Sequence, residues 1–267
     1  LSGNTGSENA HDGIYLTASV TGTSTLIPQP GLPFIFGSVS VGTDQTLDLA
    51  PGTIVKFQNA NRDLAVYGTL NVQGTVEDPV VLTSFKDDAR GGDTNGDGDA
   101  TSPAPGDWGH LRVSSHGAAV LDHAVVQYGG YGNGEMIDNS HGSLSVRNSE
   151  IRFSLNRGIS SRYASHFVVA DSTIRDNYDE GVYLYNHAAI VTKTVFADNG
   201  AEGLEYSESG DSETLVFLDN TFTGNGDYPL YIEAEDASSA DNLWLDASTL
   251  SGNTGSENAH DGIYLTA

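Results

Sequence analysis

A short phrase recurs along the C-terminal half of this chain at nearly regular intervals. An apolar residue is followed three positions later by Asn, and then by Gly or Pro with a second apolar residue. The Asn slot is held by Asn177, Asn199, Asn225 and Asn253, and an earlier copy has Ser154 in its place. Successive slots are 23, 22, 26 and 28 residues apart. Several short strands in each period of this length are typical of one turn of a parallel β-solenoid.

This period predicts an all-β fold in which each turn stacks on the next through strand hydrogen bonds about 4.8 Å apart. Equivalent residues then form columns, so we expect Asn177, Asn199, Asn225 and Asn253 to form a structural amide ladder. Leucine-rich repeats have a similar period but need a Leu-rich consensus that is missing here. The 32 Gly residues fit many turns, and a hydrophobic content of 37% argues against disorder.

A second, longer repeat is found at the two ends of the sequence. Residues 1–18 and 250–267 both read LSGNTGSENAHDGIYLTA, at an offset of 249 residues. Two explanations remain open: a window on a longer protein with a tandem unit, or an engineered copy of one coil. We favour the tandem unit, because neither copy carries the polar cap that a free solenoid end needs. A unit of about ten coils would span on the order of 50 Å.

These repeats suggest an organisation in three parts. Residues 1–18 would be the last coil of a preceding unit, and residues 46–267 a parallel β-helix with an Asp-rich loop at 87–107. Between them, residues 19–45 contain Pro28, Pro30 and Pro33, which favours a bridge between two units.

The N-terminal half contains the segments TLDLAPGTIVKF (46–57), LAVYGTLNVQGTVEDPVVLTS (64–84) and DDARGGDTNGDGDATSPAPGDWGHLRV (87–113). With the C-terminal phrases, these resemble bacterial right-handed parallel β-helix repeat proteins, the pectate-lyase-like solenoids of large exported surface proteins. The resemblance implies a right-handed parallel β-helix outside the cell or on its surface. It says less about function, because the group includes lyases, epimerases, adhesins and plain stalks.

The segment DTNGDGD (93–99) carries the sharpest local motif. Its D-x-N-x-D-G pattern begins a calcium loop, in which alternate side chains converge and Gly permits the turn. The twelfth position, which holds Glu in a helix–loop–helix site, is Ala104, so we expect a lone calcium loop inserted between coils. A solvated acidic turn is the alternative. The expected ligands are the side chains of Asp93, Asn95, Asp97 and Asp99, with Asp107, Asp87 or Asp88 completing the coordination.

A second column should lie on the outer surface of the solenoid. Strand alternation places the residue after each Gly-apolar step outside, which gives one residue per coil: Tyr183, Glu205, Tyr231 and Tyr264. Stacked aromatic side chains could contact sugars or a neighbouring fibre, although they also stabilise sheets by themselves. The acidic residues 202, 205, 208, 211 and 213 could form a carboxylate pair of a glycosidase, but on so acidic a chain such pairs arise by accident, and we predict no catalytic residue.

The net charge of −25 makes nucleic acid and anionic membranes poor partners. No apolar stretch is long enough to cross a membrane. From the tandem duplication we predict that the chain is not an enzyme but a structural or adhesive unit, joined end to end with identical units in a fibre or stalk. The alternative is a β-helix that binds or degrades a cell-surface or extracellular polysaccharide as a lyase or hydrolase.

Overall fold

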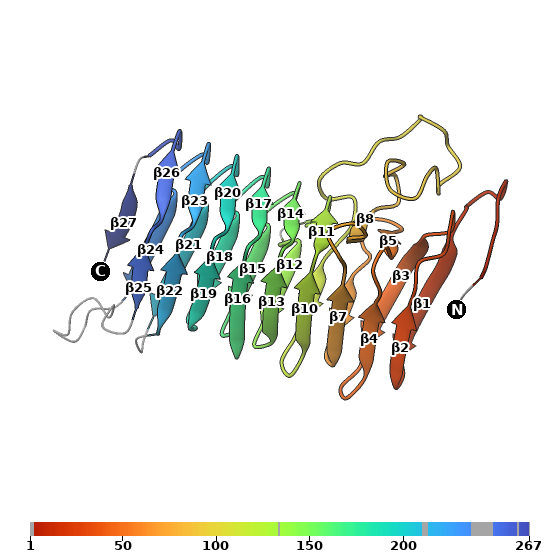
Figure 1. The fold of residues 1–267 in the computed structure, drawn as a ribbon, viewed down its shortest axis with the longest axis horizontal. Coiled ribbons are helices and arrows are strands. Elements are labelled where there is room, and N and C mark those ends of the chain that lie inside the picture. The colour runs from red at the N-terminus through yellow and green to blue at the C-terminus, as the bar shows by residue number, and fades with distance from the viewer. Residues whose placement is uncertain (1–2, 133, 210–212, 236–247, 261, 267) are drawn as a thin grey trace.

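The computed structural model describes the whole chain except residues 1–2, 133, 210–212, 236–247, 261 and 267. The described residues form strands joined by turns and bends, without a helix. The strands stack side by side along one long axis, and the first and last strands lie at opposite ends (Figure 1). All pairings between them are parallel. The predicted all-β parallel solenoid is therefore confirmed.

The strands form two hydrogen-bonded sheets. The larger sheet makes up two walls and the smaller sheet a third, so each regular turn of the chain contributes one strand to each of three walls. Wall A contains β1 (Ile14–Val20), β3 (Phe34–Val41), β6 (Leu64–Val66), β9 (Leu111–Val113), β12 (Ile137–Ser140), β15 (Ile159–Arg162), β18 (Val182–Tyr185), β21 (Leu204–Ser209), β24 (Leu230–Glu235) and β27 (Ile263–Thr266). Wall B contains β2 (Thr23–Leu26), β4 (Thr46–Leu49), β7 (Thr69–Gln73), β10 (Ala118–Asp122), β13 (Ser143–Arg147), β16 (His166–Ala170), β19 (Ala189–Thr192), β22 (Leu215–Leu218) and β25 (Thr249–Ser251). Wall C contains β5 (Ile54–Phe57), β8 (Val80–Ser84), β11 (Ala124–Gln127), β14 (Glu150–Arg152), β17 (Thr173–Arg175), β20 (Val195–Ala197), β23 (Thr221–Thr223) and β26 (Thr254–Ser256). The first halves of the long strands β1 and β3 also belong to wall C, because residues 14–16 pair with 34–36, and 34–36 pair with 55–57 of β5.

Strand alternation fills the interior between the walls. In β13, Leu144 and Val146 are fully buried, while the alternating residues Ser143, Ser145 and Arg147 face outward. They pair in register with Phe167 and Val169 of β16, which are also buried. Because each coil repeats this register, inward side chains form continuous apolar columns. Burial of these columns is the main stabilising contribution to the fold.

From β10 onward, a tight corner of one or two residues connects each strand of wall B to the next strand of wall C. In five successive coils the corner residue adopts a left-handed backbone with φ between 49° and 56°; these residues are His123, Asn148, Asp171, Lys193 and Asp219. Asn and Asp tolerate this conformation better than most side chains, and Gly tolerates it best. Gly252 has φ 68° after β25, at the equivalent corner. The sequence therefore turns the chain at the same point in each coil.

The predicted bridge at 19–45 is wrong, because these residues belong to the solenoid. Strand β2 pairs with β4 in wall B, and β3 pairs with both β5 and β6. Phe34 and Phe36 of β3 are buried in the core. The three prolines fall between β2 and β3, where no strand hydrogen bond is needed, so they interrupt no wall.

The Asp-rich segment connects β8 to β9 and forms no strand. It projects from the edge of the solenoid near β5 and β8, as the yellow loop in Figure 1. The loop lies against the N-terminal segment, where the amide of Asp12 donates a hydrogen bond to the carbonyl of Thr94 at 3.2 Å. Below it, the buried Lys56 of β5 donates from Nζ to the carbonyl of Gly92 at 2.7 Å.

Candidate functional site

The outer surface of wall A brings the predicted outward column together. Tyr183 of β18 pairs with Glu205 of β21, Glu205 with Tyr231 of β24, and Tyr231 with Tyr264 of β27. The four residues are therefore neighbours on successive coils, one strand spacing apart. Their inward neighbours Val182 and Leu204 are fully buried, so the column follows from strand alternation.

Three carboxylates meet beside this column. Glu180 and Glu202 lie two residues before the inward residues of β18 and β21, and Glu205 follows the inward residue of β21. One carboxylate oxygen from each lies within 4.8 Å of the others. Glu180 is buried, and Glu202 and Glu205 are half-buried. We call these three residues the glutamate cluster.

The cluster holds its carboxyl groups in different protonation states. Burial, together with the hydrogen bond and negative charge of Glu180, raises the pKa of Glu205 to about 8. Burial also raises the pKa of Glu202. For Glu180, burial again raises the pKa, but hydrogen bonds with Arg157 and Glu205, together with the positive charge of Arg157, outweigh burial and lower the pKa. At neutral pH the cluster therefore places a protonated carboxylic acid beside an ionised carboxylate.

Arginines occupy the same surface one coil toward the N-terminus. Arg157 binds Glu180 through two parallel bonds, Nη2–Oε1 at 2.7 Å and Nε–Oε2 at 2.9 Å. Its guanidinium also lies 4.3 Å from the ring centroid of Tyr183. Arg162 pairs with Glu135 of the preceding coil. These contacts fix the side chains that border the cluster, and they leave little uncompensated positive charge there.

Aromatic rings occupy the surface on the C-terminal side of the cluster. The rings of Tyr231 and Tyr264 stack with centroids 4.8 Å apart and an interplanar angle of 9°. Tyr228 lies 4.9 Å from Tyr264 and stacks on His260 at 4.7 Å. Together Tyr228, Tyr231, Tyr264 and His260 form an aromatic platform next to the glutamate cluster, where the apolar faces of sugar rings can pack.

Sequence reasoning missed Glu180, Arg157 and the Tyr228–His260 pair. The sequence did contain a signal for Glu180, because Glu180 and Glu202 both immediately precede the Gly of the recurring phrase. Of the acidic residues considered as a glycosidase pair, Glu208 is buried and accepts a bond from the Tyr206 hydroxyl at 3.1 Å. Glu213 belongs to no cluster among the described residues, and Asp211 lies outside them.

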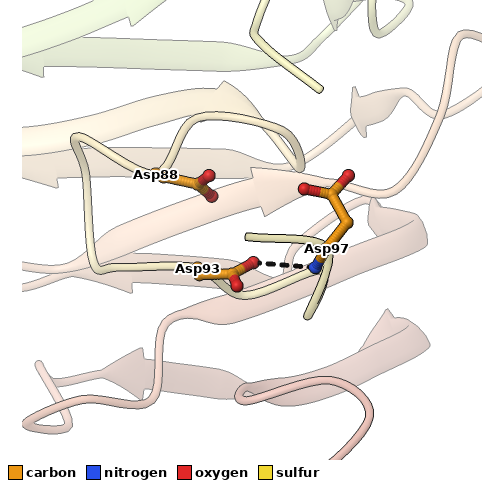
Figure 2. A group of neighbouring side chains, drawn as sticks. All are labelled: Asp88, Asp93 and Asp97. Carbon is orange, nitrogen blue, oxygen red and sulfur yellow. Dashed lines mark hydrogen bonds between the residues drawn. The ribbon is translucent and has the colours of Figure 1, made fainter. Parts of the chain in front are cut away.

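In the Asp-rich loop, the structure brings together three of the predicted calcium ligands. Oxygens of Asp88, Asp93 and Asp97 lie within 4.8 Å of one another, and Figure 2 shows Asp88 and Asp93 directed toward the side where Asp97 lies. Asp93 accepts backbone bonds from Gly96, Asp97 and Gly98, which shape the turn. The Oδ1 atoms of Asp88, Asn95 and Asp97 are buried without a hydrogen-bond partner in the described chain.

The other predicted ligands make different contacts. Asp87 is buried and accepts bonds from Thr83 at 2.6 Å and Gln127 at 2.8 Å. Asp107 accepts from Lys86 at 2.6 Å and from Ser84 at 2.7 Å. Asp99 is exposed and lies outside the three-residue group. The loop thus offers the oxygens of residues 88, 93, 95 and 97 to a cation.

The structure also places the predicted amide ladder. Asn177 donates from Nδ2 to Asn199 Oδ1, and Asn199 donates in the same way to Asn225, both at 2.9 Å. The next member is Asn258 rather than Asn253, because Asn225 donates to Asn258 Oδ1 at 2.8 Å. Asn253 belongs to a parallel ladder and accepts from Asn220 at 2.9 Å. The expected position was wrong because Gly255 takes the place of the apolar residue that marks the earlier copies.

A comparison with known protein families agrees with this fold. The family described as "Right handed beta helix region" matches residues 111–243. A mutant of the periplasmic alginate epimerase AlgG aligns with 11% identity and a TM-score of 0.38, covering 91% of this chain and 77% of that one. The A-module of the Azotobacter vinelandii mannuronan C-5 epimerase AlgE4 aligns with 12% identity and a TM-score of 0.27, covering 96% and 91%.

No curated protein matches the sequence. In the described part of the chain, no helix has the length and apolar character needed to span a membrane. The expectation of a non-enzymatic protein is contradicted, since the solved structures to which the chain is similar are of epimerases, which are enzymes. The expected resemblance to right-handed parallel β-helix proteins is confirmed.

Proposed function

We propose that this right-handed parallel β-helix protein acts on an extracellular polysaccharide along the outer surface of wall A. In this proposal the aromatic platform binds the sugar chain, and the glutamate cluster supplies acid–base catalysis on a glycosidic bond. Glu205 is the proton donor, and Glu180 is the carboxylate that stays ionised beside it. The proposed location is the cell exterior or surface.

The observation that carries the proposal is the divergence of the carboxyl pKa values in the glutamate cluster. A general acid must be protonated at working pH, and an ordinary glutamate is not. Burial and the neighbouring Glu180 carboxylate raise the pKa of Glu205 to about 8. Arg157 keeps Glu180 ionised through its paired hydrogen bonds. Neighbouring titratable groups with pKa values pushed apart are the usual arrangement for acid–base work.

The charges and aromatic rings around the glutamate cluster favour a neutral or weakly acidic sugar chain. The protein carries a net charge of −25, which repels a strongly anionic polymer. The two arginines beside the cluster are paired with Glu180 and Glu135, so they offer little charge to a uronic acid. Pyranose rings present apolar C–H faces, and Tyr231 and Tyr264 expose parallel rings one strand apart.

The test is incubation of the chain with soluble neutral glycans and, in parallel, with uronic-acid polymers. New reducing ends report hydrolysis, and ultraviolet absorbance of unsaturated products reports lyase chemistry. We expect reducing ends from a neutral glycan, and a loss of roughly 10²–10⁴-fold in rate for Glu205→Gln. Tyr231→Ala should weaken sugar binding while leaving the protonation of Glu205 in place.

The matched control is Glu77→Gln, which makes the same change on an exposed turn between β7 and β8. This variant should keep the parent rate. Equal activity of Glu205→Gln and Glu77→Gln would remove Glu205 as the acid. Absence of both binding and product with every glycan class would refute the proposal as a whole.

A second function, calcium binding in the Asp-rich loop, is favoured by a separate observation. Oxygens of Asp88, Asp93 and Asp97 converge within 4.8 Å, and buried Oδ1 atoms there have no hydrogen-bond partner in the described chain. Carboxylate and amide oxygens are the ligands that Ca²⁺ prefers, and the chain has no Cys to favour zinc. Calorimetric titration with CaCl₂ tests this site, and no saturable heat up to millimolar calcium would exclude it.

A further inference from the structure

The outer surface of wall B is almost free of charge. From β7 to β25, its strands follow one another along the long axis (Figure 1). Their outward side chains are mainly Thr, Ser, Ala, Val and Ile, and we call this surface the neutral face. Its central column has one residue on each strand, and strand pairing aligns Asn71, Val120, Ser145, Val168, Ile190, Val216 and Thr249. The only Asp, Glu, Lys or Arg among the outward residues of these strands are Asp122 and Arg147.

The neutral face contrasts with the rest of the molecule. The chain carries 36 Asp and Glu residues and a net charge of −25. Outward positions on walls A and C hold several charged side chains, namely Arg112, Asp138, Glu150, Arg152, Arg162, Arg175 and Glu205. Wall B is therefore the surface on which another molecule can approach without facing a row of carboxylates.

Apolar side chains are exposed on the neutral face. Val120 and Ile190 are 42% and 41% exposed, and Val216 and Leu218 of β22 are half-buried. Because they lie on parallel strands in register, they form one continuous patch rather than scattered residues. Contiguous exposed apolar patches on a soluble protein mark surfaces that meet a partner.

We propose that the neutral face is an interface between two copies of this chain, which pair side by side through wall B about a two-fold axis. The two solenoids then lie against each other along their lengths, so this contact is lateral and distinct from any joint between solenoid ends. The inference is independent of the proposed polysaccharide activity, because the glutamate cluster lies on wall A.

The geometry of the neutral face favours a second copy as the partner. A two-fold interface uses the same patch on both partners, so the patch must fit itself. On both copies the rows of side chains are one strand spacing apart, about 4.8 Å. Rows of one copy therefore fit between rows of the other, as in two sheets packed face to face about 10 Å apart.

The two charges on the face are also self-complementary. Asp122 of β10 and Arg147 of β13 have opposite signs and pair in register on neighbouring strands. Arg147 is exposed and forms no ion pair with any residue in the described part of the chain. A second copy offers an Asp122 to this Arg147 and an Arg147 to this Asp122. A highly charged partner of another kind would find only these two side chains to pair with.

The size of the face predicts a weak, reversible pair. The seven strands from β7 to β25 are three to five residues long, which gives about 500 Å² on each copy and about 1,000 Å² in the pair. This area reaches the lower limit of roughly 1,000 Å² for a specific interface. The net charges of the two copies repel each other at long range, and salt screens this repulsion. Pairing should therefore tighten as salt is added.

Sedimentation velocity of the full chain tests the pairing, from about 1 to about 200 µM protein. We expect the average mass to rise from that of one chain toward that of two. The dissociation constant should be at least about threefold lower in about 0.5 M NaCl than in about 0.05 M. A chain that stays single throughout this range, or a pair that loosens with salt, would overturn the proposal.

Two variants place a charge in the central column of the neutral face. Ile190→Lys and Val120→Lys should each raise the dissociation constant at least about tenfold. The matched control is Val195→Lys, which makes a comparable change at a 36% exposed valine on wall C and should leave pairing unchanged. Circular dichroism melting checks that all three variants are folded. Pairing that survives both wall B substitutions, or that Val195→Lys weakens equally, would show that wall B is not the interface.

Discussion

Replacement of one asparagine in the amide ladder tests whether these side chains hold the coils together. Asn199 is almost fully buried, at 1% exposure. Its Nδ2 donates to Asn225 Oδ1 at 2.9 Å and to the carbonyl of Ile174 at 3.1 Å. Its Oδ1 accepts from the backbone N and from Nδ2 of Asn177, at 3.4 and 2.9 Å. Asn199→Ala removes all four bonds and so interrupts the amide ladder at that coil.

The size of the effect follows from these four bonds. A hydrogen bond in a folded protein contributes about 0.5–1.5 kcal/mol net, and a buried group left without its partner costs about 1–3 kcal/mol. Some of the abandoned groups will find water or a longer bond. We therefore expect Asn199→Ala to lower the free energy of unfolding by roughly 3–5 kcal/mol. That is a large part of the roughly 5–15 kcal/mol that stabilises an ordinary domain.

Urea denaturation followed by circular dichroism measures the loss. The matched control is Asn61→Ala, since Asn61 is exposed on a turn and should change the free energy of unfolding by no more than about 0.5 kcal/mol. A loss below about 1 kcal/mol for Asn199→Ala would mean that water replaces the ladder at little cost. In that case strand pairing and apolar burial alone would hold the coils in register.

Three further predictions follow from the core, the loop and the glutamate cluster. Phe222→Ala, which removes a ring stacked 4.8 Å from Phe196, should lower the free energy of unfolding by about 3–5 kcal/mol in the same urea assay; a loss under about 1 kcal/mol would contradict the stacked core. Asp97→Asn should weaken calcium binding by calorimetry, whereas Asp99→Asn, outside the converging group, should change it little; the reverse order would disprove the assigned ligands. The folded pKa of Glu205 is raised from 4.5 to about 8, so the folded state holds the proton that the unfolded state has lost, and this residue makes stability fall as pH rises through that range. In Glu205→Gln, the melting temperature should therefore fall less steeply as pH rises through this range. If the melting temperature of the variant depended on pH as steeply as that of the parent, the raised pKa would be refuted.

The sequence by itself determined the architecture and the direction of the side chains. The 22–28-residue period predicted stacked coils, because each coil must hydrogen bond to the next at a fixed spacing. Alternation then placed Tyr183, Glu205, Tyr231 and Tyr264 in one outward column, which is where they lie. Both results depend on local periodicity, which the order of residues carries directly.

Only the tertiary structure decided how columns at different corners meet. Asn253 carries the same local phrase as Asn225, yet it stacks on Asn220, because register is set by the whole coil. The prolines near residue 30 suggested a bridge, but they fall where the solenoid needs no strand bond. The glutamate cluster joins residues 22 and 25 positions apart in sequence, and its proton affinities depend on burial and on Arg157 of a third coil. Periodicity defines each column separately, whereas distances between columns, and hence pKa values, arise only when the coils are closed and stacked.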